Sequence, residues 1–563
     1  MLFSSQFWSR CRRVLGRSLV KLMLAHFVLG GLVCLALPPV GFYPILGVIF
    51  PLALWTIQRE TQFWRVFWLG WSFGLGFFVF GLYWITNAVL IGGATYLWAI
   101  PFALFGLPSF LAFFIAMVFS LWHWLGLRNW QGVVVFAILW TLAEYLRGHI
   151  LTGLPWNLIA YSVERSDSLR QGASLVGAYG VSLAVVLVAT VPILLSPGSR
   201  RRSGNLVATG LVVLLGLGWW GYGSHRLSQA QSLEQRGQPR VKLRLIQPNI
   251  PQAMGYDLGR VRAIIRSLRD LSFTNLDPTT AAILWPEGAT ELLFEREAEL
   301  RKSIAETLPK TTKLITGTPR ATILDRVGGF VAANQRFDNS NLDDENEKVS
   351  YSNGLVVFNH NNEIEASYDK YHLVPFGEYI PFADFLPLQK LVQFPSDFTA
   401  GPGPKLISVP GLPPFIPMIC YEGIFPGAHS SIEKTYNNQA SWLLSVTNDA
   451  WFGASSGPYQ HLVQNKWRGV EEGLPMVRVA NTGVSAVSDS FGRIVISSRL
   501  NATAVIDVEL PNRLQSQTLY AKYQDRLWLL IAGIVLVLLW LWQHGHNYTM
   551  QLLNIYSFKP RND

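Results

Sequence analysis

The stretch "PMICYEGIFP", residues 417–426, runs from an apolar strand into a turn and places Cys420 directly before Tyr421 and Glu422. The chain contains only three cysteines, and this one ends an apolar run with a carboxylate two residues away. A buried free cysteine often serves as a small hydrophobic side chain. The stretch alone therefore fits a structural thiol as well as a reactive one, and the rest of the chain has to separate the two.

The composition is that of a membrane protein with one globular part. Of 563 residues, 50% are hydrophobic and only 15% are charged, whereas about a quarter is usual in soluble proteins. The hydrophobic residues concentrate in 17–223 and again in 526–543, and residues 241–510 have ordinary globular composition. We therefore expect a polytopic α-helical membrane domain and a separate folded domain.

Eight apolar blocks define the expected membrane spans. They occupy residues 19–40, 43–57, 67–85, 96–122, 132–146, 172–195, 206–223 and 527–542. Most approach or exceed the roughly 20 residues that cross a hydrocarbon core, and the second and fifth are short. The predicted organisation is a seven-helix membrane domain (1–223), a linker (224–240), a globular domain (241–510), a linker (511–525), an eighth helix (526–545) and a C-terminal tail (546–563) that we expect in the cytoplasm.

Arginines in alternate loops predict the orientation of these spans. They are Arg10, Arg12, Arg13, Arg17, Arg59, Arg65, Arg128, Arg200, Arg201 and Arg202. With these loops in the cytoplasm, residues 224–525 lie outside it. The loop 146–170 carries three arginines on the outer side, against this rule, which suggests that it has a function. The anchoring arginines also account for the net charge of +10, and no basic stripe suggests nucleic acid as a partner.

Residues 241–510 show strands alternating with helical stretches, which predicts a layered α/β domain. The polar segment 321–350 reads as an irregular surface insertion. Glu287, Lys370 and Cys420 each follow a predicted strand. Singly, the first could cap a helix, the second could be an exposed turn lysine and the third could be core. Together, a base, a cation and a thiol are the parts of covalent acyl transfer, because a base activates the thiol and a cation stabilises the oxyanion.

The motifs around these three residues resemble a known family. "WPEGAT" (285–290), "YDKYHLVPFGEYIP" (368–381) and "MICYEGIFP" (418–426) are similar to the Glu, Lys and Cys motifs of the nitrilase, or carbon–nitrogen hydrolase, superfamily. The similarity is closer to its membrane branch, the apolipoprotein N-acyltransferases. "LRGHILTGLPWN" (146–157), "TNDAWFG" (447–453) and "TLYAKYQDRLW" (518–528) are typical of that branch.

This resemblance implies an α-β-β-α sandwich on the extracytoplasmic side of a bacterial inner membrane. The sequence shows no metal cluster and no nucleotide-binding loop, so we expect no cofactor and no metal. A phospholipid would acylate Cys420, and the α-amine of a diacylglyceryl-cysteine at an apolipoprotein N-terminus would accept the chain. Glu287 resembles the general base, Lys370 the oxyanion-stabilising lysine and Cys420 the nucleophile.

The resemblance also implies supporting and substrate-binding residues. Glu378, Tyr421 and Glu422 match supporting residues beside the triad, and Glu422 could also simply brace the turn. The candidate substrate-binding residues are Trp156, Trp451 and Tyr256, the last at a position where the family often has tryptophan.

Two other functions remain open from the sequence. A membrane-anchored amidase or nitrilase would share the triad, but a small soluble substrate needs no membrane domain. A lipid transporter with an inactive outer domain should carry buried charges in its spans, and Glu144 and Arg147 are the candidates. If the acyltransferase hypothesis holds, the triad must converge in space. The apolar segment Pro381–Phe398 should then lie near the membrane and line the lipid's path.

Overall fold

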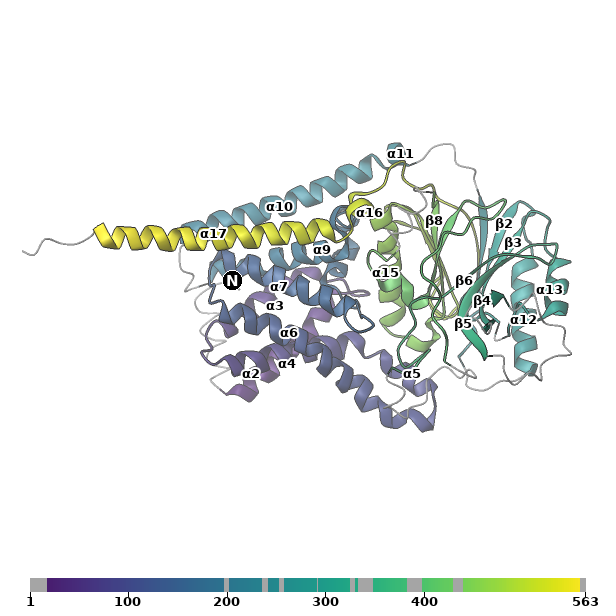
Figure 1. Ribbon diagram of the computed structural model, residues 1–563, viewed down its shortest axis with the longest axis horizontal. Coiled ribbons are helices and arrows are strands. Elements are labelled where there is room, and N and C mark those ends of the chain that lie inside the picture. The colour runs from purple at the N-terminus through teal and green to yellow at the C-terminus, as the bar shows by residue number, and fades with distance from the viewer. Residues whose placement is uncertain are drawn as a thin grey trace, which may run out of the picture.

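The computed structural model describes residues 18–196, 202–234, 241–252, 258–290, 292–324, 330–332, 348–381, 397–428 and 439–556 of the chain. Figure 1 shows an elongated molecule with a bundle of helices at one end and two β-sheets at the other, and helix α15 (Gly457–Glu472) stands between them. Tyr256 and residues 382–396, on which two expectations depend, lie outside the described residues.

Each of the eight apolar blocks contains a helix. These helices are α2 (Leu19–Val33), α3 (Leu46–Ile57), α4 (Phe63–Leu82), α6 (Leu107–Trp124), α7 (Trp130–His149), α9 (Ala173–Thr190), α10 (Arg202–Ser228) and α17 (Arg526–Tyr556). Shorter helices are α5 (Ile85–Ile91), α8 (Asp167–Arg170), α11 (Ala230–Leu233) and α16 (Leu519–Tyr523), with the short turns η3 (Ala94–Ala99) and η5 (Ile159–Arg165) between them.

Within the described ranges, five helical stretches are long and apolar enough to cross a membrane. They are Leu19–Ala36, Phe63–Leu82, Ala94–Trp124, Ala173–Leu195 and Ser203–Ser228. Tyr43–Ile57 and Arg526–Trp542 are apolar but shorter. The remaining block, α7, buries Glu144 and Arg147. A membrane protein is thus supported, and the count of eight spans stays a prediction.

The helices pack closely where glycines face a neighbouring backbone. A Cβ atom at Gly30 of α2 would lie 1.9 Å from the carbonyl oxygen of Phe73, and one at Gly76 of α4 would lie 1.9 Å from that of Phe27. Small residues of this kind let membrane helices approach each other closely, because no side chain separates the backbones. The α2–α4 pair therefore depends on both glycines.

The globular part contains two sheets. The first has the order β12-β1-β2-β3-β5-β6, with β4 beside β3, and the second has the order β11-β10-β9-β8-β7. The strands are β1 (Lys242–Gln247), β2 (Thr280–Leu284), β3 (Lys313–Leu324), β4 (Phe330–Ala332), β5 (Lys348–Phe358), β6 (Ile364–Asp369), β7 (Phe415–Ile419), β8 (Trp442–Thr447), β9 (Met476–Ala480), β10 (Ala486–Ser488), β11 (Ile494–Ser497) and β12 (Ala504–Glu509).

The sheets face each other, and helices cover both outer faces. Leu284 of the first sheet and Val446 of the second share the central core. Helices α12 (Leu258–Phe273) and α13 (Ala298–Ala305) cover the first sheet, where Leu268 and Ile304 share one core. Helix α15 covers the second sheet and, through Trp467, also joins the core of the helical bundle. The predicted α-β-β-α sandwich is confirmed.

Two local features differ from the sequence predictions. The segment 321–350 is not simply an irregular insertion, because β3 continues to Leu324, β4 occupies Phe330–Ala332 and β5 begins at Lys348. Helix α15 has no counterpart among the predicted elements. Its polar sequence reads as a surface, but most of its residues are buried between the sheet and the bundle, where their polar groups find partners.

Candidate active site

Cys420 lies at a sharp corner of the chain. Strand β7 ends at Ile419, and the short helix η8 (Cys420–Ile424) begins at the cysteine itself. The backbone of Cys420 has φ of +50°, a region that costs a residue with a side chain about 1–3 kcal/mol. Such strain persists only where the surroundings impose it, so this corner is held in place by its neighbours.

A buried polar cluster brings the predicted base and cation together. Lys370 Nζ lies 2.9 Å from Glu378 Oε2 and 3.7 Å from Glu287 Oε1. The Lys370 side chain is only 1% exposed, which excludes an exposed turn lysine. Its charge and that of Glu287 both act on the Cys420 thiol. The structure therefore gathers Glu287, Lys370, Glu378 and Cys420, residues from three separate motifs.

Asn353 on β5 connects the two carboxylates, and no motif in the sequence marks it. Its Nδ2 donates to Glu287 Oε1 at 2.8 Å and to Glu378 Oε1 at 2.7 Å. The other oxygen of Glu287 accepts from the Asn448 backbone N–H at 2.8 Å. Asn353 sits in the ordinary strand sequence "YSNGLVV", and only strand pairing places it beside Lys370, whose N–H donates to the Asn353 carbonyl.

The electrostatics of the cluster fit a general base facing a neutral thiol. Burial raises the pKa of Glu287, Lys370 opposes this rise and Glu378 adds to it. Burial and the Glu287 charge raise the pKa of Cys420, so the sulfur carries its proton at neutral pH. Although burial alone would lower the Lys370 pKa, the charges of Glu378 and Glu287 outweigh it and raise that pKa. For the predicted role of Cys420 as nucleophile, the thiol would therefore have to give its proton to a nearby acceptor as it attacks.

Glu422 holds the chain around the Cys420 corner by hydrogen bonds. It accepts hydrogen bonds from the Ile419 N–H at 2.7 Å, from the Tyr371 N–H at 2.8 Å and from the Tyr368 hydroxyl at 2.9 Å. Burial raises its pKa to about 7, while these donors favour the ionised form. Glu422 thus ties the end of β7, just before Cys420, to the segment that follows Lys370.

The loop 150–158 of the helical bundle packs against the Cys420 turn and the segment that follows Lys370. The Tyr421 hydroxyl donates to the Gly153 carbonyl at 2.7 Å, and a ring nitrogen of His372 lies 2.8 Å from the Thr152 carbonyl oxygen. Gly153 has φ of +73°, and a Cβ atom there would lie 2.3 Å from the Gly148 oxygen, so only glycine fits. The arginine-bearing loop 146–170 therefore lies beside the Cys420 turn.

The aromatic residues proposed to bind substrate have different surroundings. Trp156 is 2% exposed, its indole N–H donates to Gln460 at 2.7 Å, and its ring packs 4.5 Å from that of Trp84. Trp451 is half-buried in the turn η9 (Asp449–Phe452). The observed role of Trp156 is to join the bundle to α15, and a substrate contact at either residue stays a prediction.

Glu144 and Arg147, the charges considered for a transport path, serve the same loop. Glu144 accepts from the Ile159 N–H at 2.9 Å and from the Trp140 indole at 3.0 Å. Arg147 donates to the carbonyls of Leu154 and Trp156, each at 2.6 Å. Glu144 Oε1 and the Arg147 guanidinium are thus engaged in shaping the loop, whereas Glu144 Oε2 is buried without a hydrogen-bond partner in the described part of the chain. Because both residues hold the loop, their burial weakens the argument for a transporter.

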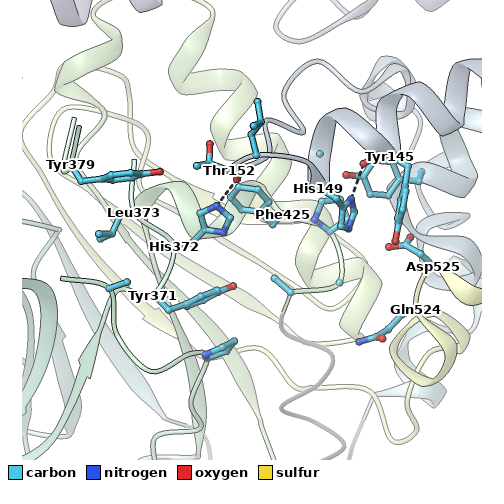
Figure 2. Close-up of a pocket in the computed structure, with 18 of the residues that line it drawn as sticks. Tyr145, His149, Thr152, Tyr371, His372, Leu373, Tyr379, Phe425, Gln524 and Asp525 are labelled. Carbon is cyan, nitrogen blue, oxygen red and sulfur yellow. Dashed lines mark hydrogen bonds between the residues drawn. The ribbon is translucent and has the colours of Figure 1, made fainter. Parts of the chain in front are cut away.

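A cavity of about 1060 Å³ lies where the bundle meets the sheets (Figure 2). One side is formed by Tyr371, His372 and Phe425, the residues just beyond Lys370 and at the end of the Cys420 turn. The other side includes Tyr145 and His149 at the end of α7 and, around the start of α17, Gln524, Asp525, Arg526 and Leu529. Within the described ranges, no group of three or more His, Cys, Asp or Glu residues could hold a metal ion.

Comparisons with known proteins agree with this architecture. Residues 29–191 match the family described as "Apolipoprotein N-acyltransferase N-terminal domain", and residues 282–518 match "Carbon-nitrogen hydrolase". The chain is 35% identical over 525 residues to an apolipoprotein N-acyltransferase of Rhodopseudomonas palustris, covering 90% of this chain and 93% of that protein.

The corresponding protein of Bradyrhizobium diazoefficiens is also 35% identical, over 521 residues, covering 90% of this chain and 92% of that protein. Among solved structures, an amidase of Nesterenkonia aligns with 50% of this chain and 94% of its own at 17% identity, with a TM-score of 0.33. On the sequence similarity over nearly the whole chain, the protein belongs to the apolipoprotein N-acyltransferase family.

Proposed function

We propose that the protein moves a fatty acyl chain from a membrane phospholipid, through a thioester on Cys420, to the N-terminal α-amine of diacylglyceryl-cysteine in apolipoproteins. The observation that carries this proposal is the buried cluster of Glu287, Lys370, Glu378 and Cys420, in a domain that packs directly on a bundle of apolar helices. A soluble acyl acceptor or donor would not require that packing.

In the first step, Glu287 takes the thiol proton as sulfur attacks the ester carbonyl of the phospholipid. The oxyanion that forms faces Lys370 and the Tyr421 backbone N–H, which follows the cysteine. The carbonyl carbon then releases the glycerol oxygen, Glu287 returns the proton to that oxygen, and lysophospholipid leaves. Glu378 and Asn353 keep the lysine and the base in position throughout.

In the second step, the α-amine attacks the thioester carbon. An α-amine has a reference pKa near 8, so part of it is neutral at physiological pH. Glu287 accepts a proton from the attacking nitrogen, the carbon–sulfur bond breaks, and the proton returns to the sulfur. The amide is formed and the enzyme regains its starting state, with no net change in protons.

Lipid access is the role we assign to the cavity at the domain junction. Its lining joins residues that flank the catalytic motifs to the ends of α7 and α17, which are apolar helices of the bundle. A lipid whose tails stay among these helices can bring its ester to the catalytic domain without exposing the tails to water. The arginine pattern supports a position of this domain on the extracytoplasmic side of the inner membrane.

The test is a burst experiment with purified protein. Phospholipid alone should yield about one equivalent of lysophospholipid and an acyl-enzyme, because no amine is present to accept the chain. Cys420→Ala should abolish the burst, and a diacylglyceryl-cysteine peptide should restart turnover and carry the chain on its amine. Continuous release of free fatty acid without the peptide would show a hydrolase instead.

A further inference from the structure

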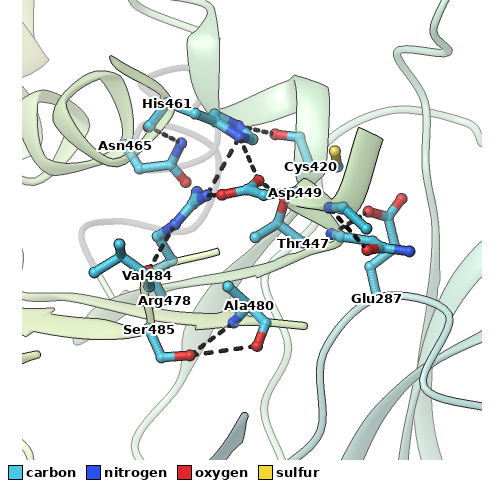
Figure 3. A network of polar contacts seen from close by, with 12 residues as sticks. Glu287, Cys420, Thr447, Asp449, His461, Asn465, Arg478, Ala480, Val484 and Ser485 are labelled. Atoms are coloured by element: carbon cyan, nitrogen blue, oxygen red, sulfur yellow. Dashed lines mark hydrogen bonds and ion pairs between the residues drawn. The ribbon is translucent and has the colours of Figure 1, made fainter. Parts of the chain in front are cut away.

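A second buried network of polar side chains contacts Cys420 from the side of α15, and the mechanism above does not use it (Figure 3). His461 of α15 lies with Nε2 3.0 Å from the Cys420 carbonyl oxygen and with Nδ1 3.0 Å from Asp449 Oδ1. Arg478 of β9 pairs with Asp449 at 2.5 Å. All three side chains are at most 1% exposed. Burying charged groups is costly because they lose their water, so three titratable side chains buried next to the proposed nucleophile call for a physical explanation.

The contacts determine which nitrogen of His461 carries a hydrogen toward the cysteine. A backbone carbonyl only accepts hydrogen bonds, so Nε2 must be the donor to Cys420. The other nitrogen faces Asp449 and also Arg478 Nη2, at 3.3 Å. The rings of Trp156 and Phe452 lie with centroids 5.8 Å and 5.6 Å from the imidazole. Contacts at both ring nitrogens and with two neighbouring aromatic rings thus hold the imidazole in the orientation that points Nε2–H at Cys420.

The carbonyl that His461 holds belongs to the peptide that joins Cys420 to Tyr421. A trans peptide is planar, and its C=O and N–H point in opposite directions. Fixing the Cys420 carbonyl toward α15 therefore also fixes the direction of the Tyr421 N–H, away from α15. A hydrogen bond accepted by the carbonyl also polarises the amide and strengthens its N–H as a donor.

We propose that His461, held by Asp449 and Arg478, is a positioning residue that orients the Cys420–Tyr421 peptide so that its N–H can serve the oxyanion together with Lys370. This inference rests on the proposed function, since it concerns the tetrahedral intermediates of that reaction. It also helps to explain how Cys420 is kept at φ of +50°. The carbonyl bond to His461 fixes the peptide after the residue, and Glu422 holds the Ile419 N–H, which belongs to the Met418–Ile419 peptide one residue upstream.

The experiment compares two amide substitutions that separate the nitrogens of the ring. In His461→Gln the amide nitrogen can reach the position of Nε2 and keep the bond to Cys420. In His461→Asn the shorter amide can replace only Nδ1 and keeps the bond to Asp449. Tyr459→Phe, at a 38% exposed position of the same helix, is the control for changes in α15.

Two reactions of Cys420 are then measured in each variant. The lysophospholipid burst passes through an oxyanion, whereas alkylation by iodoacetamide is a direct displacement and forms none. His461→Asn should slow the burst about 10- to 100-fold, approaching the effect of losing one oxyanion donor, and should change the alkylation rate less than about threefold, by the same reasoning. His461→Gln and Tyr459→Phe should stay close to the wild type in both reactions.

Several results would overturn the inference. A burst in His461→Asn within threefold of the wild type would show that the carbonyl bond is not needed, and a parallel fall in alkylation would show general damage to the site. If the asparagine variant does not fold, His461→Met serves in its place, because it fills the volume without donating. A wild type that alkylates but forms no acyl-enzyme would refute the proposed function itself, and with it this role of His461.

Discussion

Replacing Asn353 by alanine tests whether the bridge between the two carboxylates supports catalysis. Its Nδ2 donates to Glu287 at 2.8 Å and to Glu378 at 2.7 Å. A hydrogen bond to a charged group contributes about 1.5–3 kcal/mol, and each 1.4 kcal/mol corresponds to about tenfold in rate. If the bond to Glu287 positions the base, its loss should slow the burst about 10- to 150-fold.

The same substitution should move the pH dependence of the burst in a defined direction. Asn353 stabilises the ionised form of Glu287 and so lowers its pKa, against the rise caused by burial. Without Asn353, the Glu287 pKa should rise further. The base then loses its proton only at higher pH. The acidic limb of the profile of burst rate against pH should therefore shift to higher pH.

Asn359 provides a matched control just beyond the end of β5. Its Nδ2 likewise bridges two carboxylates, those of Glu363 and Glu365, each at 2.9 Å. The Asn359 Oδ1 also accepts from the backbone N–H groups of Asn361 and Glu363, so Asn359→Ala should reduce thermal stability at least as much as Asn353→Ala and leave the burst rate and its pH profile unchanged. Three results would refute this role of Asn353: a burst rate of Asn353→Ala within threefold of the wild type, a shift of its acidic limb to lower pH, or an equal loss of burst rate in both variants.

Three further substitutions test separate parts of the site. Glu287→Gln should slow the burst about 10²–10⁴-fold. In the wild type the rate should fall as pH drops through the Glu287 pKa, which burial raises above its ordinary value. A rate that stays constant down to pH about 4, near the reference pKa of a glutamate, would speak against this base. Tyr421→Phe leaves the Gly153 carbonyl without its 2.7 Å partner and should lower the free energy of unfolding by about 1–3 kcal/mol, which thermal unfolding in detergent can measure. Gly153→Ala should cost at least as much and slow acyl transfer, because a Cβ there would lie 2.3 Å from the Gly148 oxygen; an alanine variant as stable and active as the wild type would contradict the docking of this loop.

The proposed catalytic groups could be predicted from the sequence because each stands in a short local motif. Glu287, Lys370 and Cys420 follow strands that are visible as apolar runs, and helix-length apolar blocks show the membrane part equally directly. These features depend on neighbouring residues in the chain, and so a linear reading finds them. The four-layer sandwich was implied by the resemblance that those motifs carry.

Tertiary structure alone decided how these groups are held. The bond between His372 and Thr152 joins residues 220 positions apart, and that between Tyr421 and Gly153 joins residues 268 apart, so no local pattern contains either pair. Asn353 looks like any strand residue, and α15 looks like a surface helix because its polar side chains meet their partners only after folding. Burial reverses what composition suggests: a lysine that reads as an exposed turn residue is 1% exposed between two carboxylates. Local sequence motifs thus identify the proposed reacting groups. Their charge states and orientation, in contrast, arise from contacts that form only when distant segments pack and water is excluded.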